Sequence, residues 1–235
     1  MAGKLYLIPS TIGETPVEEV IPPSVQIIIR SIRIYIVENE RTARRMLIKF
    51  GINTPIDQLK FFILNKYTSQ SEIPDFFSSI ATENIGLLSE AGVPAIADPG
   101  SEVIRLAHSR NIEVIPLVGP SSILMAMMAS GLNGQNFAFT GYLPVKANER
   151  IRRIKHLEQR SQLENQSQIF IEAPYRNNQL LKDLLTACHP QTELCIASNI
   201  TGEGEYIRTA TVRTWKKNIP DLNKKPTIFI LHKLK

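Results

Sequence analysis

The residues best suited to chemistry lie in one stretch, Gly86–Gly100, which reads GLLSEAGVPAIADPG. Glu90 and Asp98 supply two carboxylates, which can accept hydrogen bonds or take up a proton. The glycines of the stretch permit positive φ and close backbone approach, and its prolines fix φ and remove hydrogen-bond donors. These features favour a loop that holds a ligand. The alternative is an ordinary connection in which Asp98 caps a helix that begins near Ser101.

This loop follows Ile85–Leu88, a short apolar run typical of a buried parallel strand. Strands and helices alternate along the rest of the chain. The predicted strands are residues 4–8, 33–37, 59–64, 85–88, 113–117, 137–144, 169–172, 193–198 and 227–231, and the predicted helices are residues 16–30, 42–50, 75–81, 102–110, 123–129, 148–162 and 178–187. The alternation predicts an α/β protein with a doubly wound parallel sheet, in which small molecules bind beyond the carboxyl ends of the strands.

Two further loops follow predicted strands and carry polar groups. Residues 9–14, PSTIGE, follow the first strand and form a second candidate ligand loop. Residues 38–41, ENER, follow the second strand. The length suits two modest domains, and a Gly-Pro turn marks a change of character, so we predict domains at 1–117 and 118–235.

Composition narrows the class of protein. Hydrophobic residues make up 43% of the 235 residues and charged residues 21%, which is ordinary for a globular chain, and the net charge of +5 permits an anionic partner. Cys188 and Cys195 are the only cysteines, and the four histidines are scattered, so we expect buried thiols and no metal site. The most apolar window, 25–37, contains two arginines and is shorter than the ~20 residues that span a bilayer. The apolar run at residues 5–8 is too short for the apolar region of a signal sequence. We therefore expect a cytoplasmic protein.

Several motifs together resemble one family. Ser89–Gly100 follows the pattern Ser-Asp-Ala-Gly-Thr-Pro-x-Ile-Ser-Asp-Pro-Gly, with substitutions at Glu90, Val93 and Ala97. Further matches are Glu38 and Arg41, Gly51-Ile52, Pro116, Gly119-Pro120-Ser121, Gly141-Tyr142-Leu143-Pro144 with Lys146 and Arg150, and Phe170–Arg176. The chain resembles the tetrapyrrole methylase superfamily, the class III S-adenosylmethionine-dependent methyltransferases, and within it the branch of the ribosomal-RNA small-subunit methyltransferase I type.

The resemblance implies a fold, a cofactor and an assembly. It implies two α/β domains with S-adenosylmethionine bound in the cleft between them, and a homodimer. Carried over by position, the donor contacts fall at Ile8, Pro9, Glu90, Ala91, Gly92, Val93, Ser121, Ser122, Ile171, Ala197 and Thr227. No metal is implied.

The reaction implied is methyl transfer to a ribose 2′-hydroxyl of small-subunit ribosomal RNA, in which alignment supplies much of the rate. The candidates for a proton acceptor are Asp98, Glu38 and Lys66; each can equally be a helix cap or a surface ion-pair partner. Arg41, Lys146, Arg150, Arg152, Arg153 and Arg176 can line a basic rim for RNA phosphates or form solvated helix faces. Tyr67, Tyr142 and Tyr175 can stack unpaired bases.

Two other functions remain open at this stage. The first is a methyltransferase of a tetrapyrrole or another small molecule, which a deep apolar cleft without a basic rim would favour. The second is a protein that retains the fold and the donor pocket but has lost catalysis.

Overall fold

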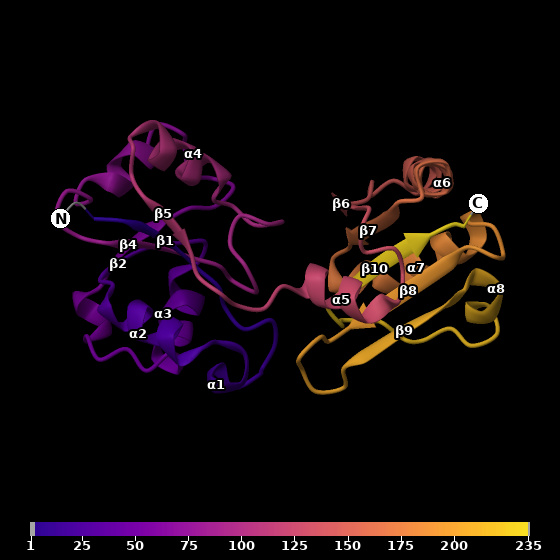
Figure 1. Cartoon of the computed structure of the whole chain (residues 1–235), viewed down its shortest axis with the longest axis horizontal. Helices are drawn as coiled ribbons and strands as arrows, with labels where there is room; N and C mark the ends of the chain where they lie inside the picture. Colours follow the sequence, from indigo (N-terminus) through magenta and orange to yellow (C-terminus); the bar gives the residue numbers. More distant parts are fainter. Residues whose placement is uncertain (1–2, 235) are drawn as a thin grey trace. The chain divides into compact units, whose positions relative to one another are not determined.

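The computed structural model describes residues 3–234, which form two compact units (Figure 1). The first unit ends at Ser121 and the second begins at Ser122. The predicted boundary after residue 117 and this division both lie between strand β5 (Val114–Pro116) and helix α5 (Ser122–Ser130).

Unit 1 is built on a parallel sheet, as the sequence predicts. Its strands are β1 (Leu5–Ile8), β2 (Ile34–Val37), β3 (Lys60–Ile63), β4 (Ile85–Leu88) and β5 (Val114–Pro116), in the order β3-β2-β4-β1-β5. β2 and β4 are buried along their whole length, which explains their uniformly apolar sequences.

Helices cover both faces of this sheet. The helices α1 (Val17–Val20), α2 (Pro23–Ser31) and α3 (Glu40–Lys49) pack on one face, and the 3₁₀ helix η2 (Ile73–Phe77) and α4 (Ser101–Ser109) on the other; a further 3₁₀ turn, η1, spans Ile56–Gln58. The segment 16–30 was predicted to be helical with Pro22-Pro23 disturbing it, and it forms two helices because Pro22 and Pro23 end α1 and start α2. The helix predicted over 75–81 is instead η2 followed by turns.

The connections after neighbouring strands leave on opposite faces. β1 and β4 are paired side by side, yet the chain after β1 enters α1 and the chain after β4 enters α4 (Figure 1). β2 and β4 differ in the same way, since α3 follows β2. Such a divergence opens a crevice at the carboxyl ends of the strands, where open α/β sheets bind ligands.

Unit 2 contains a mixed sheet. Its strands are β6 (Phe137–Tyr142), β7 (Ser167–Ile171), β8 (Glu193–Ser198), β9 (Tyr206–Thr211) and β10 (Thr227–His232), in the order β6-β7-β10-β8-β9. Only β6 and β7 pair in parallel; the remaining pairs are antiparallel. β9 is an edge strand that the sequence analysis missed.

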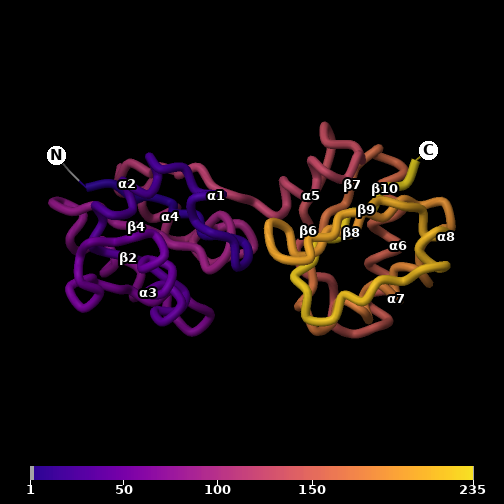
Figure 2. The backbone as a smooth tube through the Cα atoms, turned by 90° about the horizontal axis from the view of Figure 1, so that it is seen from below, coloured from indigo at the N-terminus to yellow at the C-terminus, as the bar shows by residue number. Residues whose placement is uncertain are grey.

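Two separate cores hold unit 2 together. Helix α5 (Ser122–Ser130) packs on one face, and α6 (Ala147–Glu164), α7 (Asn177–Ala187) and α8 (Val212–Trp215) pack on the other, so the sheet lies between them (Figure 2). The 3₁₀ helix η3 (Pro174–Arg176) joins β7 to α7. Cys188 and Cys195 are buried free thiols, as expected. Over residues 3–234 no helix has the length and apolar character needed to cross a membrane.

Candidate functional site

Three loops of unit 1, those that follow β1, β4 and β5, contact one another at the carboxyl ends of these strands. Ser10 and Gly92 form a two-way backbone bridge with N···O distances of 2.8 and 3.2 Å, and the Ser10 hydroxyl donates to the Ser89 carbonyl at 2.6 Å. Gly92 has a φ of +70°, and a Cβ there would lie 3.3 Å from the Pro120 carbonyl oxygen. At Gly119 a Cβ would lie 2.2 Å from the Pro9 ring. The positive φ at Gly92 and the close approach of the Pro9 ring to Gly119 both favour glycine at these positions.

An acidic cluster lies beside this junction. The Ser89 hydroxyl donates to Asp98 Oδ2 at 2.9 Å. Burial of the Asp98 carboxyl, reinforced by the neighbouring charges of Glu38 and Glu90, raises its pKa to about 6, although the hydrogen bond from Ser89 opposes this shift. The alternative role for Asp98 as a helix cap is wrong, because Gly100 occupies the N-cap of α4 and no side chain caps it.

The loop that carries Asp98 has a strained backbone. Ala95 and Ala97 adopt φ angles of +64° and +58°, in the left-handed region that disfavours residues with a Cβ. Gly100 has a φ of +144°. Strain of this kind persists only where the surrounding structure enforces it, and it is common at ligand-binding and catalytic sites.

Two pockets adjoin the acidic cluster, and Glu90 lines both. The first has a volume of about 320 Å³ and lies between the loop after β1, helix α3 and the end of β4. The second has a volume of about 560 Å³ and is lined by Glu38, Asn39, Asn65, Lys66, Tyr67, Glu90 and Pro99. Two of the three candidate proton acceptors, Glu38 and Lys66, therefore share a pocket, and the third, Asp98, precedes the lining residue Pro99.

Helix α3 contributes residues that the sequence analysis did not single out for the site. The Thr42 hydroxyl donates to a carboxylate oxygen of Glu90, and Thr42, Arg45 and Met46 line the first pocket. Asn39 caps the helix by accepting the backbone N–H groups of Arg41 and Thr42 at 2.9 and 3.2 Å. The signal available in the sequence was a helical segment that follows a strand end and carries Arg41, Arg44, Arg45 and Lys49.

The donor-binding candidates of unit 1 occupy this region with different exposures. Ile8 and Pro9 are buried; the Ile8 carbonyl accepts the Ser89 N–H at 3.2 Å. Glu90 and Ala91 are exposed, and Val93 is half-buried. Ser121, also half-buried, is the last residue of the unit.

The candidates of unit 2 gather at one end of its sheet. Ile171 pairs with Ile228, which in turn pairs with Ala197, and Thr227 begins the same strand. Ala197 and Thr227 are buried. Ser122 is the first residue of α5, the helix that packs on the face of the sheet to which Ala197 and Ile228 contribute. A donor cleft between the domains stays a prediction.

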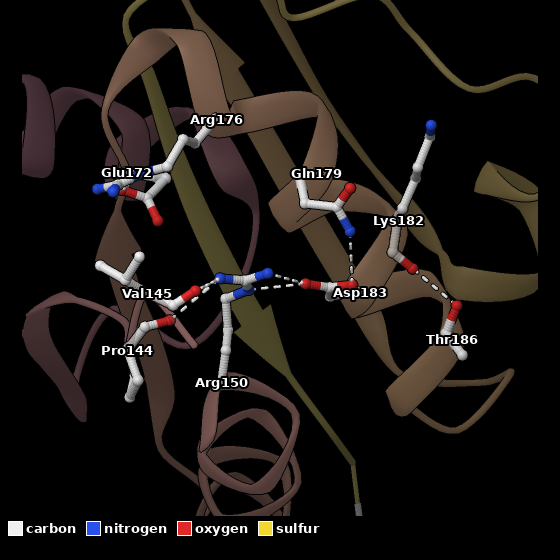
Figure 3. A network of polar contacts seen from close by, with 9 residues as sticks. All are labelled: Pro144, Val145, Arg150, Glu172, Arg176, Gln179, Lys182, Asp183 and Thr186. Atoms are coloured by element: carbon white, nitrogen blue, oxygen red, sulfur yellow. Dashed lines mark hydrogen bonds and ion pairs between the residues drawn. The ribbon is translucent and has the colours of Figure 1, made fainter. Parts of the chain in front are cut away.

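The charged network in Figure 3 corrects the predicted basic rim. Arg150 is 6% exposed, and its Nε and Nη2 each lie 2.6 Å from Asp183 Oδ2 (Figure 3). Its Nη1 donates to the carbonyl oxygens of Val145 and Pro144 at 2.6 and 3.2 Å. Arg150 was therefore wrongly assigned to the rim: it fastens the segment after β6 to helix α7.

The remaining rim candidates are accessible to different extents. Arg41 and Arg152 are exposed, Arg153 is half-buried, and Lys146 is exposed with Glu149 at 3.5 Å. Arg176 donates from Nη2 to Glu172 Oε1 at 2.5 Å. Among the described residues, no group of three or more His, Cys, Asp or Glu side chains is arranged to hold a metal ion.

Comparison with known proteins gives consistent findings. No protein-family model matches the chain. It is 31% identical over 230 residues to the ribosomal RNA small subunit methyltransferase I of Xylella fastidiosa, covering 97% of this chain and 80% of that protein. It is also 31% identical over 212 residues to the protein of the same name from Synechocystis, covering 90% and 72%.

Solved structures share the fold. A crystal structure of the methyltransferase CobJ matches with a TM-score of 0.65 at 14% identity, over 99% of this chain and 95% of that one. The cobalt precorrin-4 methyltransferase CbiF matches with a TM-score of 0.60 at 14% identity, over 97% and 94%. These likenesses confirm the expected tetrapyrrole methylase-like α/β fold.

Proposed function

Since the chain belongs to the ribosomal RNA small subunit methyltransferase I family, we propose that it transfers a methyl group from S-adenosylmethionine to a ribose 2′-hydroxyl of small-subunit ribosomal RNA. The enzyme class, methyltransferase, follows from the family. The acceptor and the donor are the parts proposed here. The observation that carries the proposal is the junction of three loops beside the acidic cluster and its two pockets.

The chemistry of the donor matches the residue types at this junction. S-adenosylmethionine carries a sulfonium and an ammonium group, and the carboxylates of Glu38 and Glu90 would attract both. Glu90 can also accept hydrogen bonds from ribose hydroxyls. The proposed donor contacts are Ile8, Pro9, Glu90, Ala91, Gly92, Val93, Ser121 and, in unit 2, Ser122, Ile171, Ala197 and Thr227.

Asp98 is the proton acceptor that the geometry favours. Its carboxylate is oriented by Ser89 at 2.9 Å, and a pKa of about 6 leaves it ionised at pH 7.5 while making it a stronger base than an ordinary aspartate. Glu38 and Lys66 line the neighbouring pocket and are better suited to contacting the acceptor or adjusting the charge of the site. Alignment of the hydroxyl with the methyl carbon would supply the larger part of the rate.

The test is methyl transfer from labelled S-adenosylmethionine to small ribosomal subunits, with the modified nucleotide mapped by mass spectrometry. We expect one ribose methylation. Asp98→Asn should lower kcat by about 10²- to 10⁴-fold, a typical contribution of a positioned base, while donor affinity measured by calorimetry changes little. If the donor binds and no ribosomal RNA is methylated, the proposed acceptor is wrong.

The same assay separates the other candidates. Transfer to a tetrapyrrole but not to RNA would indicate a small-molecule methyltransferase. Donor binding without transfer to either substrate would indicate a protein that has lost catalysis. The homodimer and the cytoplasmic location remain predictions, which light scattering and cell fractionation can test.

A further inference from the structure

Two tyrosines of unit 2 expose much of their surface at the same end of the sheet. Tyr142 ends β6 and is 59% exposed, and Tyr175 lies in η3 and is 69% exposed. Tyr142 pairs with Ile171, the last residue of β7, and η3 begins three residues later. A large aromatic ring exposed to this extent is costly to hydrate, so two of them together point to a binding surface.

Arg176 packs beside the Tyr175 ring at this end of the sheet. Its guanidinium carbon lies 5.4 Å from the centre of the Tyr175 ring. Hydrogen bonds to the buried Glu172 hold the guanidinium at 2.5 and 3.0 Å, and this carboxylate, with smaller contributions from Tyr175 and Tyr142, raises the pKa of Arg176. The position of the planar cation beside the Tyr175 ring is therefore fixed by Glu172.

The backbone beneath these side chains is held rigidly. On one side, Arg150 binds the carbonyl oxygens of Pro144 and Val145, directly after Tyr142 and Leu143 (Figure 3). On the other, the Lys224 N–H donates to the Pro174 carbonyl at 3.1 Å, next to Tyr175. A surface that is ordered before binding loses less conformational entropy when a ligand arrives.

The charge of unit 2 suits a polyanion. Residues 122–235 contain 16 lysines and arginines against 9 acidic residues, whereas residues 1–121 contain 11 against 13. The exposed Lys146 lies four residues after Tyr142, and the exposed Lys224 is hydrogen-bonded through its backbone N–H to Pro174, next to Tyr175. The nearby Glu172 is buried and paired with Arg176. All of the excess positive charge therefore belongs to the unit that carries the exposed rings.

We propose that Tyr142, Tyr175 and Arg176 form a stacking platform for unpaired nucleotides of the RNA. The platform rests on the proposed function and adds to it the residues that hold the acceptor strand. Aromatic rings and guanidinium planes stack on the faces of unpaired bases, and lysines beside them contact phosphates. A duplex does not offer those faces, so the ligand is single-stranded RNA or a loop.

The test measures binding of a fluorescently labelled single-stranded RNA of twelve nucleotides by anisotropy, in the absence of methyl donor. Tyr142→Ala and Tyr175→Ala should each weaken binding by about 5- to 100-fold, the range expected for loss of one stacked base. The phenylalanine variants at both positions should bind within about twofold of the original protein, because they keep the ring.

Arg213→Ala is the matched control for charge. Arg213 lies in α8, which directly follows the last residue of β9. That residue pairs with the first residue of β8, so α8 lies at the opposite end of the sheet from Tyr142. This change should weaken RNA binding by less than about threefold, whereas Arg176→Ala should weaken it by more than about fivefold. Calorimetry with S-adenosylmethionine should show unchanged donor affinity in every variant.

The outcomes separate the platform from the proposed reaction. If the alanine variants bind the labelled RNA normally while the original protein methylates ribosomal RNA, the platform is overturned and the reaction stands. If they lose RNA affinity although no ribose is methylated, the platform stands and the reaction does not. Two other results would overturn the platform. If duplex RNA competes as well as single-stranded RNA, the surface binds a duplex. If the variants lose affinity only for whole subunits and not for free RNA, the surface binds a ribosomal protein.

Discussion

The buried pair of Arg150 and Asp183 should carry a large part of the stability of unit 2. Arg150→Met removes the guanidinium but keeps an unbranched apolar stem. Asp183, 12% exposed, would then keep a hydrogen bond only from Gln179, and the Pro144 and Val145 carbonyls would lose their donor. Removing one partner of a buried pair costs about 3–5 kcal/mol, and we expect a loss of this size in the free energy of unfolding.

Urea unfolding followed by tryptophan fluorescence measures this loss directly. Trp215 is the only tryptophan in the chain, and it is 1% exposed in the core of unit 2, so its emission reports on that unit alone. Arg160→Met is the control: it removes the same group from the same helix, but Arg160 and its partner Glu164 are 41% and 47% exposed. The control should cost less than about 1 kcal/mol.

A double variant tests the cause. Arg150→Met combined with Asp183→Leu leaves no unpaired charge in the interior, so at least half of the lost stability should return. If Arg150→Met costs no more than Arg160→Met, or if the double variant is less stable than both single variants, the buried pair does not hold this segment in place.

Two further predictions concern unit 1, whose unfolding can be followed by hydrogen exchange in β1 and β4. Folding raises the pKa of Asp98 from 3.8 to about 6, so the native protein binds this proton more tightly than the unfolded chain does. The native protein therefore loses stability as the pH rises from about 4 to about 6. Asp98→Asn should therefore be more stable than the original protein at pH 7.5, by about 1–2 kcal/mol after allowance for partial exposure. This gain in stability should vanish near pH 4. A variant that is equally stable or less stable at pH 7.5 would contradict the prediction. Gly119→Ala should cost about 1–3 kcal/mol and weaken donor binding, because its Cβ would overlap the Pro9 ring. Gly134→Ala, in unit 2 and with no atom within 4 Å of the new Cβ, should change neither donor binding nor the stability of unit 2 followed by Trp215 fluorescence.

The sequence predicted most of the elements because local pattern determines them. Ile85–Leu88 is apolar throughout and lies between two strands, and Glu193–Ser198 matches its predicted bounds. The strand at 206–211 was missed because it is an edge strand with a half-exposed, mostly polar sequence, YIRTAT, which lacks an apolar face. Its pairing with β8 decides its structure, and that contact is not local.

The members of the acidic cluster were predicted as separate residues, but their meeting was not. Glu38 follows β2 and Glu90 follows β4, and they are neighbours only because β4 inserts between β2 and β1. No periodicity in the sequence specifies that order. In the same way, the composition of α6 suggested an exposed basic helix, and only the position of Asp183 on α7 explains why Arg150 faces inward.

The uneven distribution of charge between the units also affects how the two substrates respond to ionic strength. Each phosphate contact made by residues 122–235 would release counterions, so the affinity for RNA should fall steeply as salt is raised. A methyl donor held mainly through backbone groups and a few carboxylates releases far fewer ions, and its affinity should change much less. A salt series alone would therefore distinguish capture of the nucleic acid from loading of the donor, without any change to the protein.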